Sequence, residues 1–136
     1  MERPGSHMHF DDRAAVKWQR VLAPALAEAS RDHKMVFVQV GKQECGGSRS
    51  LIERVLPKEE ITEALRESFV CVCSEVASLE PAIAERLALL PRHEPTPVCM
   101  YLDGEGRVVH STVGGRPPAV FLRDMTEALA AQKRKG

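Results

Sequence analysis

Hydrophobic residues along the chain follow two patterns, helical spacing and short continuous runs. Apolar residues that recur every three or four positions are typical of a helix with one buried face, and short β-branched runs are typical of buried strands. The continuous runs predict strands at 35–40, 69–73, 98–102 and 107–111. The helical spacing predicts helices within 12–29, 48–56, 58–66, 81–90 and 120–129. We expect Pro24 to kink or interrupt the first helix, because proline lacks the N–H that a helix interior uses.

The order of these elements indicates the fold class. Strands alternate with helices up to the last two strands, which are joined by Asp103-Gly104-Glu105-Gly106, a sequence typical of a hairpin turn. Such an order favours a mixed sheet with helices on both faces. The sequence therefore predicts an α/β protein, a three-layer α/β/α sandwich around a central mixed sheet of four strands. The lone tryptophan, Trp18, is predicted to lie on the first helix and to pack against the sheet.

The length of 136 residues fits one domain, which we expect to span 9–132. Residues 1–8 end in Gly5-Ser6-His7-Met8, which looks like a cloning scar, and we expect them to be disordered. Residues 133–136 are expected to form a basic C-terminal tail. No apolar h-region is present near the N-terminus, which favours a cytoplasmic protein; a native signal peptide that has been removed is the alternative.

Composition and charge narrow the class of partner. Lys plus Arg and Asp plus Glu both number 19, so the formal net charge is zero. A nucleic-acid-binding domain normally has a basic excess, and we expect none here. No stretch reaches the ~20 apolar residues that a membrane-spanning helix needs, so no membrane partner is expected either.

Four cysteines are present, and three of them fall in or beside apolar runs. Cys71 and Cys73 are two residues apart on one predicted strand, so their side chains share a face, where a mutual disulfide is geometrically awkward. We expect both to be buried, with no metal role. Cys99 is predicted to lie in the core, with a role as a resolving thiol as the alternative.

Cys45 differs from the other three because it stands between a predicted strand and a predicted helix. The unpaired N–H groups of a helix's first turn stabilise a thiolate, which lowers the thiol pKa and makes the sulfur nucleophilic. Glu44 opposes this effect, because one negative charge disfavours a second beside it. From the residues alone, a reactive Cys45 and an inert loop cysteine are both open.

The histidines and the known motifs add no second site. His93 lies in a proline-rich loop and is expected to be solvated. His110 is expected to be exposed on the hairpin. The sequence has no His-Glu-x-x-His, phosphate-binding glycine loop or Gly-x-Ser-x-Gly motif, so we assign no metal site.

Three segments between Asp12 and Leu129 together resemble the thioredoxin superfamily. They are Cys45-Gly46-Gly47-Ser48 at a strand-to-helix junction, Thr96-Pro97 at the start of a strand, and the 103–109 hairpin with Gly114-Gly115 before the last helix. The resemblance implies a thioredoxin-like fold in which Pro97 is a cis-proline facing Cys45. It further implies that Gly46, Gly47, Thr96 and Pro97 contact the substrate.

The chain departs from that superfamily's pattern at two places. Gln43-Glu44 stands where an aromatic residue usually precedes the first cysteine, and Ser48 replaces the second, resolving cysteine. The resemblance then implies a monothiol thiol-disulfide oxidoreductase or isomerase, with Cys45 as nucleophile and Ser48 as its hydrogen-bond donor. The expected substrate is a protein or small-molecule disulfide, with glutathione as co-substrate and no cofactor. The alternative is a redox-inactive module of the same fold that binds a polypeptide.

Overall fold

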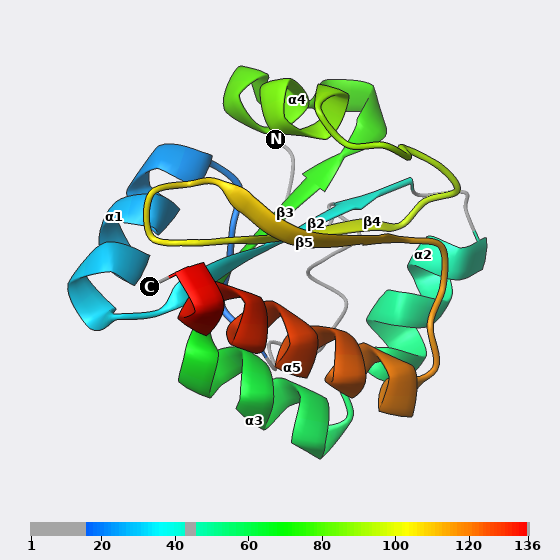
Figure 1. Ribbon diagram of the computed structural model, residues 1–136. Helices are drawn as coiled ribbons and strands as arrows, with labels where there is room; N and C mark the ends of the chain where they lie inside the picture. Colours follow the sequence, from blue (N-terminus) through cyan, green and yellow to red (C-terminus); the bar gives the residue numbers. More distant parts are fainter. Residues whose placement is uncertain (1–15, 43–45, 136) are drawn as a thin grey trace.

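A five-stranded mixed sheet forms the centre of the molecule, with helices on both sides (Figure 1). The computed structural model describes residues 16–42 and 46–135. The strand order is β1-β3-β2-β4-β5, in which β1, β3 and β2 run parallel and β4 and β5 are antiparallel additions. The parallel half requires crossover helices, and the antiparallel half is closed by the hairpin that the sequence predicts.

The elements of the first half are β1 (Trp18–Gln19), α1 (Leu22–Asp32), β2 (Met35–Gly41), α2 (Gly46–Ser50), the π-helical turn η3 (Leu51–Val55), α3 (Glu59–Ser68) and β3 (Phe69–Glu75). Those of the second half are the 3-10 turn η4 (Val76–Ser78), α4 (Pro81–Ala88), β4 (Val98–Leu102), β5 (Val108–Val113) and α5 (Pro118–Lys135). The prediction of an α/β/α sandwich is confirmed. The helix α5 continues through the basic residues that the sequence suggested as a tail.

The predicted number of strands is wrong by one, and the error lies at the N-terminal end. Trp18 and Gln19 form a short edge strand that pairs in parallel with Cys71 and Val72 of β3, so Trp18 is not helical. The first helix begins only at Leu22. Pro24 is then its third residue, where a missing N–H costs nothing because first-turn N–H groups have no partner within the helix.

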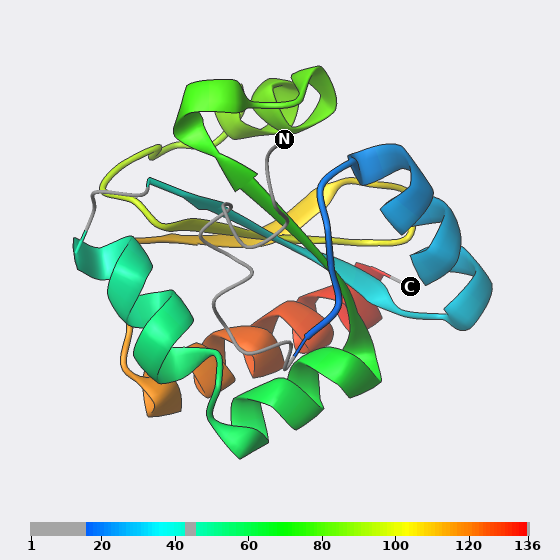
Figure 2. The ribbon, with the colours of Figure 1, turned by 180° about the vertical axis from the view of Figure 1, so that it is seen from behind.

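The two faces of the sheet carry different side chains. On β2, Val36, Val38 and Val40 point toward α1 and α4, where the buried cluster is entirely aliphatic apart from methionine. The alternate residue Phe37 belongs to the buried cluster on the other face. That face is covered by α3, α5 and the turn η3 (Figure 2). There Phe37 contacts four other aromatic rings at 5.2–6.4 Å, namely Trp18, Phe69, Tyr101 and Phe121. We call these two buried sets the aliphatic cluster and the aromatic cluster.

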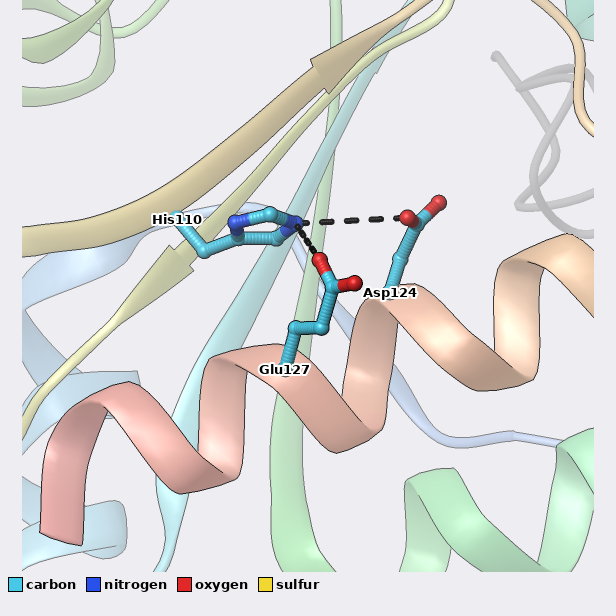
Figure 3. Close-up of side chains that lie close together, drawn as sticks. All are labelled: His110, Asp124 and Glu127. Carbon is cyan, nitrogen blue, oxygen red and sulfur yellow. Dashed lines mark ion pairs between the residues drawn. The ribbon is translucent and has the colours of Figure 1, made fainter.

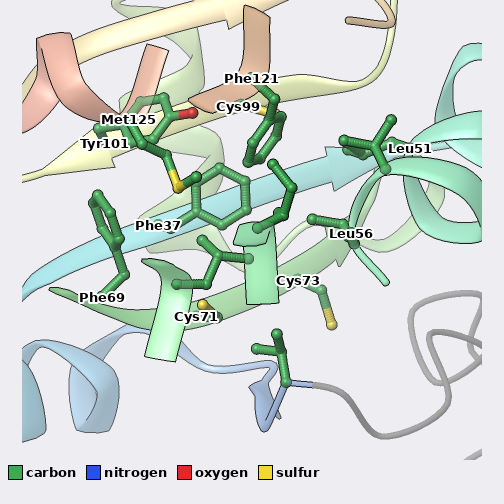
Figure 4. Close-up of a cluster of buried hydrophobic side chains, with 14 of the residues drawn as sticks. Phe37, Leu51, Leu56, Phe69, Cys71, Cys73, Cys99, Tyr101, Phe121 and Met125 are labelled. Carbon is green, nitrogen blue, oxygen red and sulfur yellow. The ribbon is translucent and has the colours of Figure 1, made fainter. Parts of the chain in front are cut away.

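All three described cysteines belong to the aromatic cluster, as Figure 4 shows. Cys71, Cys73 and Cys99 are each at most 2% exposed. The prediction that Cys71 and Cys73 are buried neighbours on one face is therefore confirmed, and so is the core position of Cys99. Among the described residues, no helix is long and apolar enough to cross a membrane.

Candidate functional site

Two of the predicted site residues fall where the structure gives no side-chain description. Cys45 lies outside the described residues, and so does the side chain of Ser48, whose backbone is part of α2. The position of Cys45 in the chain is nevertheless informative. It directly precedes α2, and the helical backbone then continues through η3 to Val55.

The first turn of α2 contacts two loops that are distant in the sequence. A Cβ atom added at Gly47 would lie 3.1 Å from the carbonyl oxygen of Thr96, 3.3 Å from Cδ of Pro97 and 3.4 Å from the backbone nitrogen of Gly115. Contacts this short leave room only for glycine without a shift of the neighbouring backbone. Residues from all three segments that carry the family resemblance therefore meet at the first turn of α2.

One backbone N–H group links the loop before β4 to the loop after β5 by hydrogen bonds. Gly114 donates to the carbonyl oxygens of both Pro95 and Pro97, at 2.8 and 2.9 Å. Its φ of 84° lies in the left-handed region, which glycine adopts without the steric penalty of a side chain. The Glu94–Pro95 and Thr96–Pro97 peptide bonds are both cis, and Pro97 is buried while Thr96 is half-buried.

A groove of about 610 Å³ opens beside Thr96, at the ends of β2 and β3. Its walls include Lys42, Val76, Leu87 and His93 together with the 94–96 loop. Val76 is 43% exposed, so an apolar side chain is available to a bound segment. His93 is exposed, as expected, and its Nε2 lies 2.8 Å from the carbonyl oxygen of Leu90. The groove thus combines apolar and charged walls, as a polypeptide site would require.

Burial keeps Cys99 protonated. Desolvation raises the pKa of its thiol to about 12; a hydrogen bond with Thr112 lowers the pKa, but by less. Because only a thiolate attacks a disulfide, Cys99 is poorly suited to resolve a mixed disulfide at neutral pH. Cys71 and Cys73 are equally buried, so the described cysteines offer no accessible second thiol.

Gln39 is a buried polar residue that the sequence analysis did not single out. It is 0% exposed, and in register it lies between Cys73 on β3 and Cys99 on β4. Neither its Oε1 nor its Nε2 has a hydrogen-bond partner among the described residues. In the sequence, Gln39 is the one polar residue within the apolar run 35–40. The run as a whole predicts a buried strand, so its single polar member did not stand out.

The structure corrects the expectation for His110. Its side chain is only 25% exposed, and its ring lies 5.5 Å from that of Tyr101. The ring sits between β5 and α5, where it approaches Asp124 and Glu127. The sequence places His110 in a hairpin strand, but only the packing of α5 against that strand covers it.

Comparison with known proteins identifies the family. The thioredoxin-like family model matches residues 17–104, more than half of the chain, so the protein belongs to this family. The match includes 45–48 and Thr96-Pro97, and it ends inside the hairpin turn. Among curated proteins, no match is found.

Solved structures with the same fold include several thiol-disulfide proteins. A thioredoxin from Thermus thermophilus is 24% identical, with a TM-score of 0.69 over 85% of this chain and 88% of that one. A putative disulphide isomerase from Bacteroides thetaiotaomicron is 18% identical, with a TM-score of 0.67 over 84% and 91%. A disulphide isomerase from Xylella fastidiosa Temecula1 is 20% identical, with a TM-score of 0.59 over 85% and 88%. At these identities the likeness concerns the fold.

Proposed function

We propose that the protein is a monothiol thiol-disulfide oxidoreductase or isomerase that acts on protein or glutathione disulfides through Cys45. The observation that carries the proposal is the meeting of Gly47 with Thr96, Pro97 and Gly115. It brings the start of α2, which Cys45 precedes, against the loop that lines the groove. Membership of the thioredoxin-like family supports the same class of chemistry.

The reaction proceeds by successive thiol-disulfide exchanges, two in isomerisation and three in the reduction of a protein disulfide by glutathione. The Cys45 thiolate attacks one sulfur of a substrate disulfide, forms a mixed disulfide with it and releases the other sulfur as a thiolate. In isomerisation, a second substrate thiolate attacks the substrate sulfur of the mixed disulfide, which forms a new substrate disulfide and regenerates the Cys45 thiolate. In reduction, two glutathione molecules supply the electrons and leave as glutathione disulfide.

Ser48 determines the monothiol character in this proposal. A cysteine at that position would attack the mixed disulfide from within the protein, and a hydroxyl does not. The buried Cys99, with its raised pKa, is no substitute. An external thiol or the substrate's own thiol must therefore complete the cycle.

The first test is native alkylation against pH, with the modified cysteine located by peptide mass. We expect Cys45 alone to react, with an apparent pKa below the ~8.5 of a free thiol. Cys71, Cys73 and Cys99 should react only after unfolding, because each is buried. Reaction of Cys45 only above about pH 8.5 would contradict an activated thiolate.

The second test compares Cys45→Ser with Ser48→Cys on a glutathionylated peptide and on a scrambled multi-disulfide protein. Cys45→Ser should abolish turnover of both. With the unaltered chain and the glutathionylated peptide, the mixed disulfide at Cys45 should persist until glutathione is added. With Ser48→Cys it should resolve without added thiol. Equal turnover by the unaltered chain and by the Cys45→Ser variant would contradict the proposal.

A binding module is the second candidate, and the absence of a resolving cysteine at Ser48 favours it. The groove beside Thr96 would then hold an extended polypeptide without turnover. A Cys45→Ser variant that still binds a peptide with unchanged affinity, together with an unaltered chain that lacks turnover, would establish this alternative. Loss of peptide binding in a Val76→Asp variant would assign the binding to the groove.

A further inference from the structure

Three side chains that can bind a metal converge between β5 and α5, as Figure 3 shows. His110 projects from the strand β5. Asp124 and Glu127 are three positions apart on the helix α5 and project from the same face of it. The His110 Nε2 lies 3.8 Å from Oε2 of Glu127 and 4.0 Å from Oδ1 of Asp124. All three atoms lie within 4.8 Å of one another.

The imidazole nitrogen at the centre of this cluster is buried and has no hydrogen-bond partner among the described residues. A buried polar atom normally has such a partner, so its absence calls for a physical reason. When the proton is on Nδ1, Nε2 carries a lone pair directed at two carboxylates, which repel it electrostatically. A cation between the three atoms removes this conflict.

Asp124 is held in position by a cation of the protein. Arg116 donates from Nε to Oδ2 at 2.6 Å, while its second nitrogen lies 3.4 Å from Oδ1. Oδ1 therefore keeps most of its capacity as an acceptor, and it is the oxygen that faces His110. A ligating carboxylate is commonly oriented by a hydrogen bond to its other oxygen. Asp124 is 4% exposed at its side chain, so its orientation is well defined.

We propose that His110, Asp124 and Glu127 form a binding site for a divalent transition-metal ion of the zinc type. One imidazole with two carboxylates suits zinc, and water on the open side supplies the fourth position. Tetrahedral zinc places its ligand atoms about 3.4 Å apart. The His110 distances thus need to close by only about half an ångström, and Glu127, 55% exposed, is free to rotate inward.

The charged side chains around the three ligands are compatible with a bound divalent cation. Two carboxylates face the site, and Arg116 neutralises part of one of them. Arg92 and Arg123 line the same pocket, but both are exposed, so solvent screens their charges. The pocket, of about 300 Å³, gives an ion and its water access from solvent.

This site is separate from the proposed thiol chemistry. His110 lies three residues from Val113 on β5, about 10 Å along the strand, and Val113 is the residue that pairs with Val98 beside Pro97. The metal proposal therefore does not depend on the activity of Cys45, and each can fail without the other.

The test uses the full ¹⁵N-labelled chain with Cys45→Ser, which leaves only the buried Cys71, Cys73 and Cys99, so that no accessible thiol competes for zinc. We expect one equivalent of zinc chloride to shift the Nε2 resonance of His110 to that of a metal-bound imidazole and to fix the proton on Nδ1. Magnesium chloride should leave it unchanged, because Mg²⁺ prefers oxygen ligands in octahedral geometry.

Glu127→Gln in the same background should weaken zinc binding at His110 at least tenfold, and its thermal melt should show that the fold is kept. The matched control is His33→Asn, which removes an exposed histidine from a left-handed position that asparagine tolerates. It should leave the His110 response unchanged. A His110 resonance that responds to acid but not to zinc would overturn the proposal, as would undiminished affinity in Glu127→Gln.

Discussion

The two faces of the central sheet differ in more than their apolar side chains. The aliphatic cluster, under α1 and α4, contains valine, leucine, isoleucine, alanine and methionine only. The aromatic cluster, under α3 and α5, contains five rings and three cysteines, and Gln39 and the hydroxyl of Tyr101 are buried beside it without a hydrogen-bond partner among the described residues. Both groups of features come from the same strands, because alternate residues point to opposite faces.

The two clusters differ in how much free energy of folding they give up to bury polar groups. An apolar cluster without polar groups is stable as long as its side chains fill the available volume and fit one another in shape. A cluster that buries an amide and a hydroxyl without a hydrogen-bond partner among the described residues gives up stability, because each such group costs desolvation free energy. The turn η3 contributes Leu51 and Val55 to the aromatic cluster and directly continues α2, so the helix that follows the proposed thiol site packs on the face where that cost is borne.

Phe37→Ala should have the largest effect on stability. It removes the ring that contacts Trp18, Phe69, Tyr101 and Phe121, and we expect the free energy of unfolding to fall by about 3–5 kcal/mol. Val38→Ala, at the next position on the opposite face, should cost about 2 kcal/mol. Urea unfolding followed by circular dichroism measures both. A loss for Phe37→Ala no larger than that for Val38→Ala would contradict the prediction.

Gly47→Ala tests how closely α2 approaches the loops that hold Thr96 and Gly115. Its Cβ would lie 3.1 Å from the Thr96 carbonyl oxygen, and we expect a net loss of about 1 kcal/mol despite the higher helix propensity of alanine. The control is Gly46→Ala, where a Cβ would meet nothing within 4 Å, and a gain of up to about 1 kcal/mol is expected. Opposite signs in the two unfolding curves confirm the close approach, and equal signs contradict it.

Gln39→Met should stabilise the protein by about 1 kcal/mol, because it replaces an unpaired buried amide by an apolar side chain of similar length. The matched control is Gln19→Met, since the Gln19 amide donates to Glu28 at 2.9 Å and its loss should give no gain. A Gln39→Met protein that is less stable than the unaltered chain would contradict this prediction.

The smallest expected effect on the free energy of unfolding comes from Asp103, which lies in the hairpin turn outside both clusters. Burial acts to raise its pKa, but hydrogen bonds from the backbone of Arg107 and Glu105 and from the Arg107 side chain outweigh burial and lower the pKa. Its contribution is therefore present above the unfolded-state pKa of about 4 and is lost as pH falls through the lower folded-state pKa. Asp103→Asn should flatten the acid limb of a plot of stability against pH. An unchanged slope would contradict the shift.

Much of the fold was predictable because the strands are strongly patterned. The runs at 35–40 and 69–73 are buried on both faces and read as strands without ambiguity. The two-residue strand at Trp18 was not predictable, because so short a segment has no period of its own and exists only through its pairing with Cys71 and Val72. Helical spacing on either side of it favoured a longer helix.

The candidate thiol site was predictable as three motifs, and the His110 cluster was not predictable at all. Residues 110, 124 and 127 have no spacing typical of metal ligands, since one comes from a strand and two from a helix. Asp124 and Glu127 are three positions apart, and on a solvated helix that spacing suggests nothing beyond a polar face.

The sequence by itself determined the order of the strands and helices after the N-terminal edge strand, the burial of the cysteines other than Cys45, and the identity of the segments that carry the family resemblance. These follow from local periodicity and residue type. The tertiary structure alone decided that Gly47 touches Thr96 and Gly115, that Gln39 lies between two cysteines, and that α5 covers His110. Contacts between distant residues depend on how helices dock on the sheet, and that docking is set by the packing of the whole core.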